Sequence, residues 1–253
     1  MSDNNSSNRP KFYDHVNVYD FDCKLPGSEQ DVKFKPVTTG QLKKLLTYEN
    51  EKDLIIQEQA LDDMILSSVL SEDFNIDELY LEDRFYLLVE LRKKTKGEVL
   101  EFSFTCPQCK SQSINRVDLN KLPIKPLDKK ETIVDLGHDI KVYLRRVKRK
   151  HQKEIKSSMI HQHLSEMQKQ AEVQILFHSC AIDKIETSDG LDENLKLADK
   201  QYLIENIPTG DYDKIRKGID EMAFGLDLRY TTKCRQCNFE AETIVPVENN
   251  FFT

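Results

Sequence analysis

The sequence predicts an α+β protein of two similar halves, each a β-hairpin, a few helices and a Cys-x-x-Cys knuckle, joined at one shared zinc site. Two observations predict this arrangement. Cysteine pairs occur at positions 106 and 109 and again at 234 and 237, each between two stretches rich in β-forming residues. Other short matches recur in the same order in both halves. We therefore expect residues 14–120 and 131–253 to be repeats of one unit.

The first half is expected to open with a hairpin. Residues 1–13 are polar and rich in Asn and Ser, and we predict that they form a disordered tail. Residues 16–21 and 32–37 are the two candidate strands, and the alternation of apolar and polar residues in 32–37 predicts that the second is half-buried. The Pro-Gly-Ser sequence at 26–28 lies between them and is typical of a turn.

Helices are predicted between this hairpin and the first cysteine pair. Apolar residues recur near a period of 3.6 residues, first from Leu54 to Val69 and again from Leu81 to Leu88. Thr39 precedes a further short run and is expected to lie near the N-cap of a leading helix. Strands are then expected on both sides of the cysteines, so that the pair lies at a hairpin tip.

A linker is predicted between the halves, at residues 121–130, which contain two prolines. The second half is then expected to open with another hairpin, formed by 131–136 and 140–144 around the turn at 137–139.

We expect the second half to be helical from this hairpin to about Gly225, where the strand that leads into the second cysteine pair begins. One apolar stripe is predicted from Ile155 to Met167, and the apolar pattern continues to Cys180. A last helix is expected to end near Gly225.

The separation in sequence between matched residues of the two halves grows steadily along the chain, from 108 to 128 residues. Growing offsets are expected if the second copy has gained loop residues. The matched pairs are Val32 with Ile140, Ile65 with Ile175, Leu81 with Leu197, and Cys106 with Cys234.

The two cysteine pairs predict one structural zinc ion. Two thiolates separated by two residues can bend round one ion, and a second pair completes a tetrahedron. A shell of four thiolates leaves no open position, so this site is structural and not catalytic. Free thiols and weak binding of separate ions are the alternatives. A redox motif would need the pair to open a helix, and neither pair does. The predicted ligands are Cys106, Cys109, Cys234 and Cys237.

Composition and motifs favour a cytosolic protein without catalytic activity. The formal net charge is −7, which argues against a general nucleic-acid binder. There is no apolar run long enough to span a bilayer, so no membrane span is expected. No phosphate-binding glycine loop and no Gly-x-Ser-x-Gly elbow occurs.

A basic segment stands out against the acidic background. Residues 141–153 contain seven Lys or Arg, with Tyr143 among them. Contact with phosphates or with an acidic partner is the functional interpretation, and a solvated charged face is the structural one. The several exposed aromatic residues of a single-strand-binding platform are not found here.

The sequence also resembles the T4-type bacteriophage baseplate proteins. The resemblance rests on residues 32–39, on 81–92 and above all on 91–109, which end in the first cysteine pair. It covers roughly residues 30 to 250. That family includes the baseplate hub subunit and a hub-assembly protein of contractile-tailed phages.

The resemblance implies a non-enzymatic role in forming or assembling the central baseplate hub. The implied partners are other hub proteins, and the implied location is the host cytoplasm during assembly, with the tail baseplate of the virion as a further location. The family's cysteine pairs map onto those of this chain. The alternative function is a zinc-ribbon adaptor that binds nucleic acid or an acidic protein.

Overall fold

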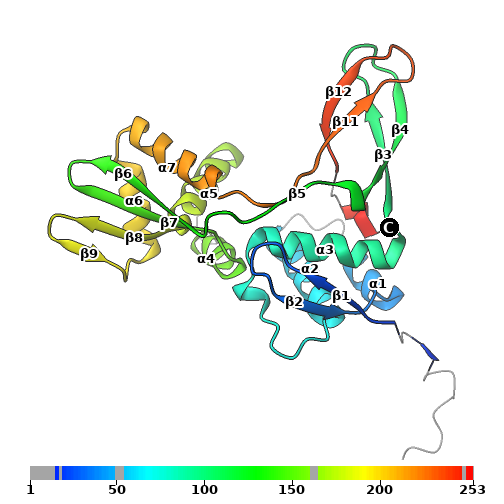
Figure 1. The fold of residues 1–253 in the computed structure, drawn as a ribbon, viewed down its shortest axis with the longest axis horizontal. Helices are drawn as coiled ribbons and strands as arrows, with labels where there is room; N and C mark the ends of the chain where they lie inside the picture. Colours follow the sequence, from blue (N-terminus) through cyan, green and yellow to red (C-terminus); the bar gives the residue numbers. More distant parts are fainter. Residues whose placement is uncertain (1–14, 17–18, 49–53, 160–164, 247–248, 253) are drawn as a thin grey trace, which may run out of the picture.

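The computed structural model describes residues 15–16, 19–48, 54–159, 165–246 and 249–252, and it confirms the predicted α+β class. This part of the chain forms seven α-helices and several small antiparallel sheets. In Figure 1 they gather into two lobes and a projecting pair of hairpins. The predicted tail, residues 1–13, lies outside the described residues.

The first lobe, residues 21–96, places a two-stranded hairpin beside three helices (Figure 1). A capping box starts the first helix, because the Thr38 side chain accepts from the Gln41 N–H while the Gln41 side chain accepts from the Thr38 N–H. The elements are β1 Phe21–Lys24, β2 Asp31–Phe34, α1 Thr39–Thr47, α2 Leu54–Ser68 and α3 Leu81–Lys96.

The first strand lies nearer to the turn than predicted. β1 begins at Phe21, whereas the sequence pattern placed the strand at 16–21. Lys24 pairs with Asp31, and residues 25–30 form the short turn between these two residues. The first strand therefore runs up to Lys24, directly before the turn, and lies closer to it than the sequence pattern indicated. Val16 and Tyr19 are exposed outside the strand.

The two cysteine-bearing hairpins stand side by side at the upper right of Figure 1. Their inner faces are in contact, because the rings of Phe102 and Tyr230 pack edge to face with centroids 6.3 Å apart. Asn115 Nδ2 also donates to Thr232 Oγ1 over 2.8 Å. The strands are β3 Val99–Thr105, β4 Gln112–Asp118, β11 Arg229–Lys233 and β12 Glu240–Ile244.

The second lobe, residues 131–222, is a four-stranded antiparallel sheet with helices packed on it, at the left of Figure 1. Its sheet order is β6-β7-β8-β9. The predicted hairpin is confirmed as β6 Glu131–Gly137 and β7 Ile140–Arg145. The other elements are α4 Arg149–Met159, α5 Glu166–Ala181, β8 Ile182–Thr187, β9 Gly190–Asp192, α6 Leu197–Asn206 and α7 Thr209–Glu221.

Two expectations for this lobe are wrong. The stretch before the second cysteine pair is not all helical, because β8 and β9 add a hairpin at 182–192 to the sheet. The stripe from Ile155 to Met167 is not one helix face, since α4 ends at Met159 and Met167 on α5 is 82% exposed. Residues 160–164 lie outside the described part.

The two stretches that connect the second lobe to the hairpins run side by side. β5 Ile124–Lys125 pairs with β10 Gly225–Leu226. The Asp227 N–H donates to the Pro123 carbonyl over 2.8 Å and extends the pairing. The chain therefore enters and leaves the second lobe at one place.

Buried apolar residues form two cores. One core combines the first lobe with both cysteine hairpins and the C-terminal segment, and the other lies within residues 134–222. Phe251 and Phe252 are 4% and 3% exposed, so the C-terminal segment folds back onto its own chain. The division into repeats at 14–120 and 131–253 stays a prediction.

The lobes are joined by a buried carboxylate. Asp62 of α2 is fully buried. One of its oxygens lies 2.7 Å from Arg84 Nε of α3. The other lies 2.7 Å from Arg149 Nη2 of the second lobe. Glu58 adds a second carboxylate, 3.0 Å from Arg84 and 3.5 Å from Arg149. Two arginines and two carboxylates thus neutralise one another between the lobes.

Each of the seven cations of the basic segment pairs with a carboxylate of this chain. Five of them reach acidic residues of the first lobe, so the segment joins the two lobes. The pairs within the second lobe are Lys141 with Glu186 and Arg145 with Asp183, and those between lobes are Arg146 with Glu82, Lys148 and Lys150 with Glu78, Arg149 with Asp62, and Lys153 with Asp77.

Replacing Asp62 with Asn should destabilise the protein by about 3 kcal/mol, because two buried arginines lose their compensating charge. Chemical denaturation monitored by circular dichroism measures this change. Asp63→Asn is the matched control, since Asp63 is exposed and only accepts from Gln59, and it should change stability by less than about 0.5 kcal/mol. Equal stability of the two variants would contradict the role of Asp62.

Candidate metal centre

The first knuckle is a tight loop at the tip of the β3–β4 hairpin. The Cys106 N–H donates to the Ser111 carbonyl, and the Lys110 N–H donates to the Cys106 carbonyl, both over 2.9 Å. Lys110 has a φ of 60°, which is the left-handed conformation that the loop requires to turn back. These bonds direct the Cys106 and Cys109 side chains to one side of the tip.

The second knuckle repeats this backbone geometry. The Cys234 N–H donates to the Phe239 carbonyl over 2.8 Å, and the Asn238 N–H donates to the Cys234 carbonyl over 3.0 Å. Asn238 has a φ of 59° and occupies the position equivalent to Lys110. Asn tolerates the left-handed region better than Lys, so the second loop is the less strained of the two.

The four predicted cysteines form one cluster. Cys106 Sγ lies 3.7 Å from Cys237 Sγ, and Cys109 Sγ lies 3.6 Å from Cys234 Sγ. All four sulfurs lie within 4.8 Å of one another. Segments 125 or more residues apart in the sequence therefore supply one compact set of donors.

These distances suit a tetrahedral metal ion and not disulfides. Four sulfurs held about 2.3 Å from one zinc ion are about 3.8 Å apart, close to the separations in this cluster. A disulfide needs its sulfurs about 2.05 Å apart, and all four thiols are free. The donor set and its spacing fit zinc, which would contribute folding energy and no open coordination position.

Ser111 helps to stabilise thiolate at the cluster. Its hydroxyl lies 3.0 Å from Cys109 Sγ and 3.3 Å from Cys234 Sγ, where it can donate to either sulfur. This hydrogen bond, together with the N–H groups of Gln236 and Cys237, lowers the pKa of Cys234 to about 6. The pKa of Cys109 is also lowered, chiefly by Ser111. Nothing in the sequence pattern distinguished Ser111 from other polar loop residues.

The two isolated cysteines differ in chemistry from Cys109 and Cys234 of the cluster. Burial raises the pKa of Cys23 to about 12, and it does the same for Cys180. At neutral pH both stay protonated and pack as small apolar side chains.

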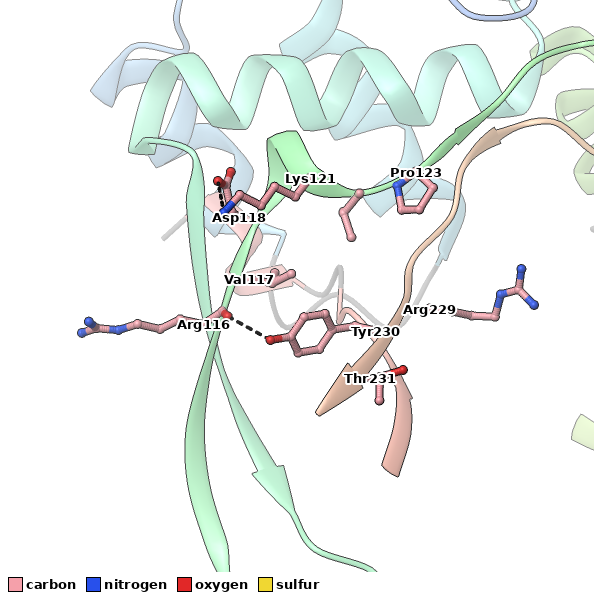
Figure 2. Close-up of a pocket in the computed structure, with 9 residues that line it drawn as sticks. Arg116, Val117, Asp118, Lys121, Pro123, Arg229, Tyr230 and Thr231 are labelled. Carbon is pink, nitrogen blue, oxygen red and sulfur yellow. Dashed lines mark hydrogen bonds and ion pairs between the residues drawn. The ribbon is translucent and has the colours of Figure 1, made fainter. Parts of the chain in front are cut away.

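A hollow of about 430 Å³ lies at the base of the paired hairpins, between β4 and β11. Figure 2 shows the Tyr230 ring crossing it, with the hydroxyl donating to the Arg116 carbonyl over 3.4 Å. The Arg116 and Arg229 side chains extend away from the hollow on opposite sides and pair with Glu101 and Asp227. Asp118 and Lys121, which also line it, pair with one another over 3.8 Å, so each charged side chain of this hollow has a partner within the chain.

Comparison with known proteins identifies the family. Residues 17–253 match the family model of the T4 bacteriophage base plate protein. The chain belongs to that family. No curated protein and no solved structure matches it. Membership in the T4 bacteriophage base plate protein family indicates a structural role in the base plate, as the sequence resemblance implied. Among the described residues, no helix is both long and apolar enough to cross a membrane.

Alkylation of reduced protein dialysed against a chelator should distinguish Cys109 of the cluster from the isolated Cys180. Cys109 is exposed and should react at least about a thousandfold faster than Cys180 at pH 7.5, because a thiol of pKa 12 is almost never ionised there. Peptide mass spectrometry over time measures the rates, and circular dichroism confirms that the chain is folded. Similar alkylation rates for Cys109 and Cys180 in folded protein would contradict the difference in their pKa values.

Proposed function

We propose that this chain is a non-enzymatic structural or assembly protein of a contractile phage tail, which forms or helps to assemble the central base plate hub. The family match over residues 17–253 supports a role in the base plate. The sequence resemblance to hub and hub-assembly proteins is what favours the hub within the base plate. Other hub proteins are the proposed partners, met in the host cytoplasm during assembly.

One structural zinc ion is the second part of the proposal. The observation that carries it is the convergence of Cys106, Cys109, Cys234 and Cys237 on one point, with separations close to those of a zinc tetrahedron. The ion would hold the tips of both hairpins together. It would supply rigidity and no reaction, because all four ligand positions are protein sulfurs.

Rigidity suits a component that docks on several neighbours, since less conformational entropy is lost when a rigid surface binds. The buried ion pairs of Asp62 and the pairing of β5 with β10 hold the second lobe in place. The proposed zinc holds the far end of the hairpins. The chain thus presents a fixed set of surfaces on its two lobes and on the paired hairpins.

The alternative, a zinc-ribbon adaptor that binds nucleic acid or an acidic protein, is less well supported. Such an adaptor needs free cations to contact phosphates. In the basic segment each of the seven cations already has a carboxylate partner within the chain, so the segment presents no row of free charges to a nucleic-acid backbone.

Purified, reduced protein should contain about one zinc ion per chain by elemental analysis. Cys106→Ser and Cys234→Ser should each lose the ion and much of the stability, because a structural site contributes folding energy directly. Cys180→Ser is the matched control, since it changes an isolated cysteine and should retain one ion. Wild-type protein that contains no metal, together with Cys106→Ser and Cys234→Ser variants that melt at the wild-type temperature, would contradict a structural metal.

A pull-down of the tagged chain from phage-infected cells should recover hub proteins of the base plate. Probing purified virions then separates the two roles, because a structural subunit stays in the particle and an assembly factor leaves it. A tagged host protein of similar size is the control. Recovery of nucleic acid without hub proteins would favour the adaptor and reject the hub assignment.

A further inference from the structure

A second hollow, of about 390 Å³, lies in the second lobe where the end of β7 meets the starts of α4 and α6. Its lining is mostly cationic or cation-forming, although the chain as a whole is acidic. One carboxylate, that of Glu154, is among the lining residues. The lining residues that can carry positive charge are Arg145, Lys150, His151, Lys196 and Lys200.

Two N–H groups face one another beside this hollow. His151 Nδ1 accepts from the Lys148 N–H over 3.0 Å, so the hydrogen of the neutral ring lies on Nε2. Arg145 Nη2 lies 3.2 Å from that same Nε2. A guanidinium is always protonated and only donates. Neither nitrogen can accept from the other, and an oxygen placed against both would accept from each.

Further donors surround the same place. Lys200 is only 7% exposed, and its Nζ donates to the Ile182 carbonyl over 2.7 Å, which leaves two of its three N–H bonds. Arg145 Nη1 pairs with Asp183 over 2.6 Å, while its buried Nε has no hydrogen-bond partner among the described residues. Buried donors of this kind are costly unless an acceptor meets them.

The start of α6 adds positive potential. Lys196 precedes the first residue of this ten-residue helix, and the helix dipole favours an anion at that end. The Asp199 side chain accepts from the Lys196 N–H over 2.9 Å and so uses one of the donors there. Within the described part of the chain, neither Lys196 nor Lys200 has a carboxylate at ion-pair distance, whereas Lys150 pairs with Glu78.

We propose that this hollow binds a phosphate group, with its oxygens accepting from Arg145, His151 and Lys200 and its charge balanced by Lys196. The donors come from a strand and two helices, so they approach from different directions. A tetrahedral oxyanion presents oxygens in all of these directions, whereas a carboxylate presents two in one plane. The site is separate from the four-cysteine cluster and does not depend on the proposed metal.

His151 offers a direct readout of the site. Its pKa is lowered to about 4, first by burial and then by Arg145, Lys150, Lys200 and Lys148. Asp183 and Glu154 are the nearby carboxylates, and the Cys180 thiol stays protonated because burial raises its pKa to about 12. A bound phosphate places negative charge beside the ring and should raise the His151 pKa by about one unit.

The test is a titration of the full chain, labelled with ¹⁵N at histidine, with sodium phosphate at constant ionic strength. The His151 ring resonances, assigned with His151→Gln, should shift saturably with phosphate and not with chloride or acetate. A pH titration with saturating phosphate should show the raised pKa. A response no greater than that to chloride, or an equal response to acetate, would overturn the proposal.

Two variants that should change the phosphate affinity in opposite directions make the test more specific. Lys196→Gln changes an exposed side chain at the start of α6 and should weaken phosphate binding about threefold. Glu154→Gln removes the opposing carboxylate and should strengthen it by a similar factor. Lys214→Gln, an exposed lysine of α7 that pairs with Asp211, is the matched control and should change nothing. Unchanged affinity in both Lys196→Gln and Glu154→Gln would also overturn the proposal.

Discussion

The position of the second lobe depends on the charge of Asp62. A lone carboxylate in a protein interior is strongly unfavourable, and so is a lone guanidinium. Asp62 is fully buried and meets Arg84 from its own lobe and Arg149 from the other, so each group is tolerated only while the others are present. The same constraint explains why the basic segment lies where it does. Five of its seven cations pair with acidic residues of the first lobe, on α2, at the start of α3 and in the turn before α3, so the boundary between the lobes is lined by paired charges.

The hairpins are held at two points by different chemistry. At their base, the pairing of β5 with β10 brings together the strands that enter and leave the second lobe. At their tips, the four sulfurs converge. Between these points the contact is mainly apolar, through Phe102 and Tyr230. Two hairpins held at both ends have little freedom to move. Separation at the base would disturb the contact between the lobes, and separation at the tips would pull the four cysteines apart.

Local patterns predicted the knuckles, the β6–β7 hairpin and the α+β class, because cysteine spacing and strand alternation are properties of adjacent residues. The same patterns missed what long-range contact decides. The stretch that contains β8 lies in the region predicted to be helical, and its pairing with β7, about forty residues earlier in the chain, makes it a strand. The basic segment was open to interpretation because its partners, among them Asp77 and Glu78, lie about seventy residues earlier. Ser111, the hydroxyl beside two sulfurs, has no sequence signal at all.

Closing the cysteine cluster is easier than the sequence separation suggests. The entropic cost of bringing two chain segments together grows with the length of the intervening loop. Between the pairs that loop is 125 residues or longer, yet most of it folds into the second lobe and is fixed by its own core. Once Arg149 has met Asp62 and β10 has met β5, Cys234 is separated from Cys106 only by short, paired strands. The proposed zinc ion would then bind a site that the rest of the fold has already assembled, and its binding energy would stabilise the lobe joint as well as the tips.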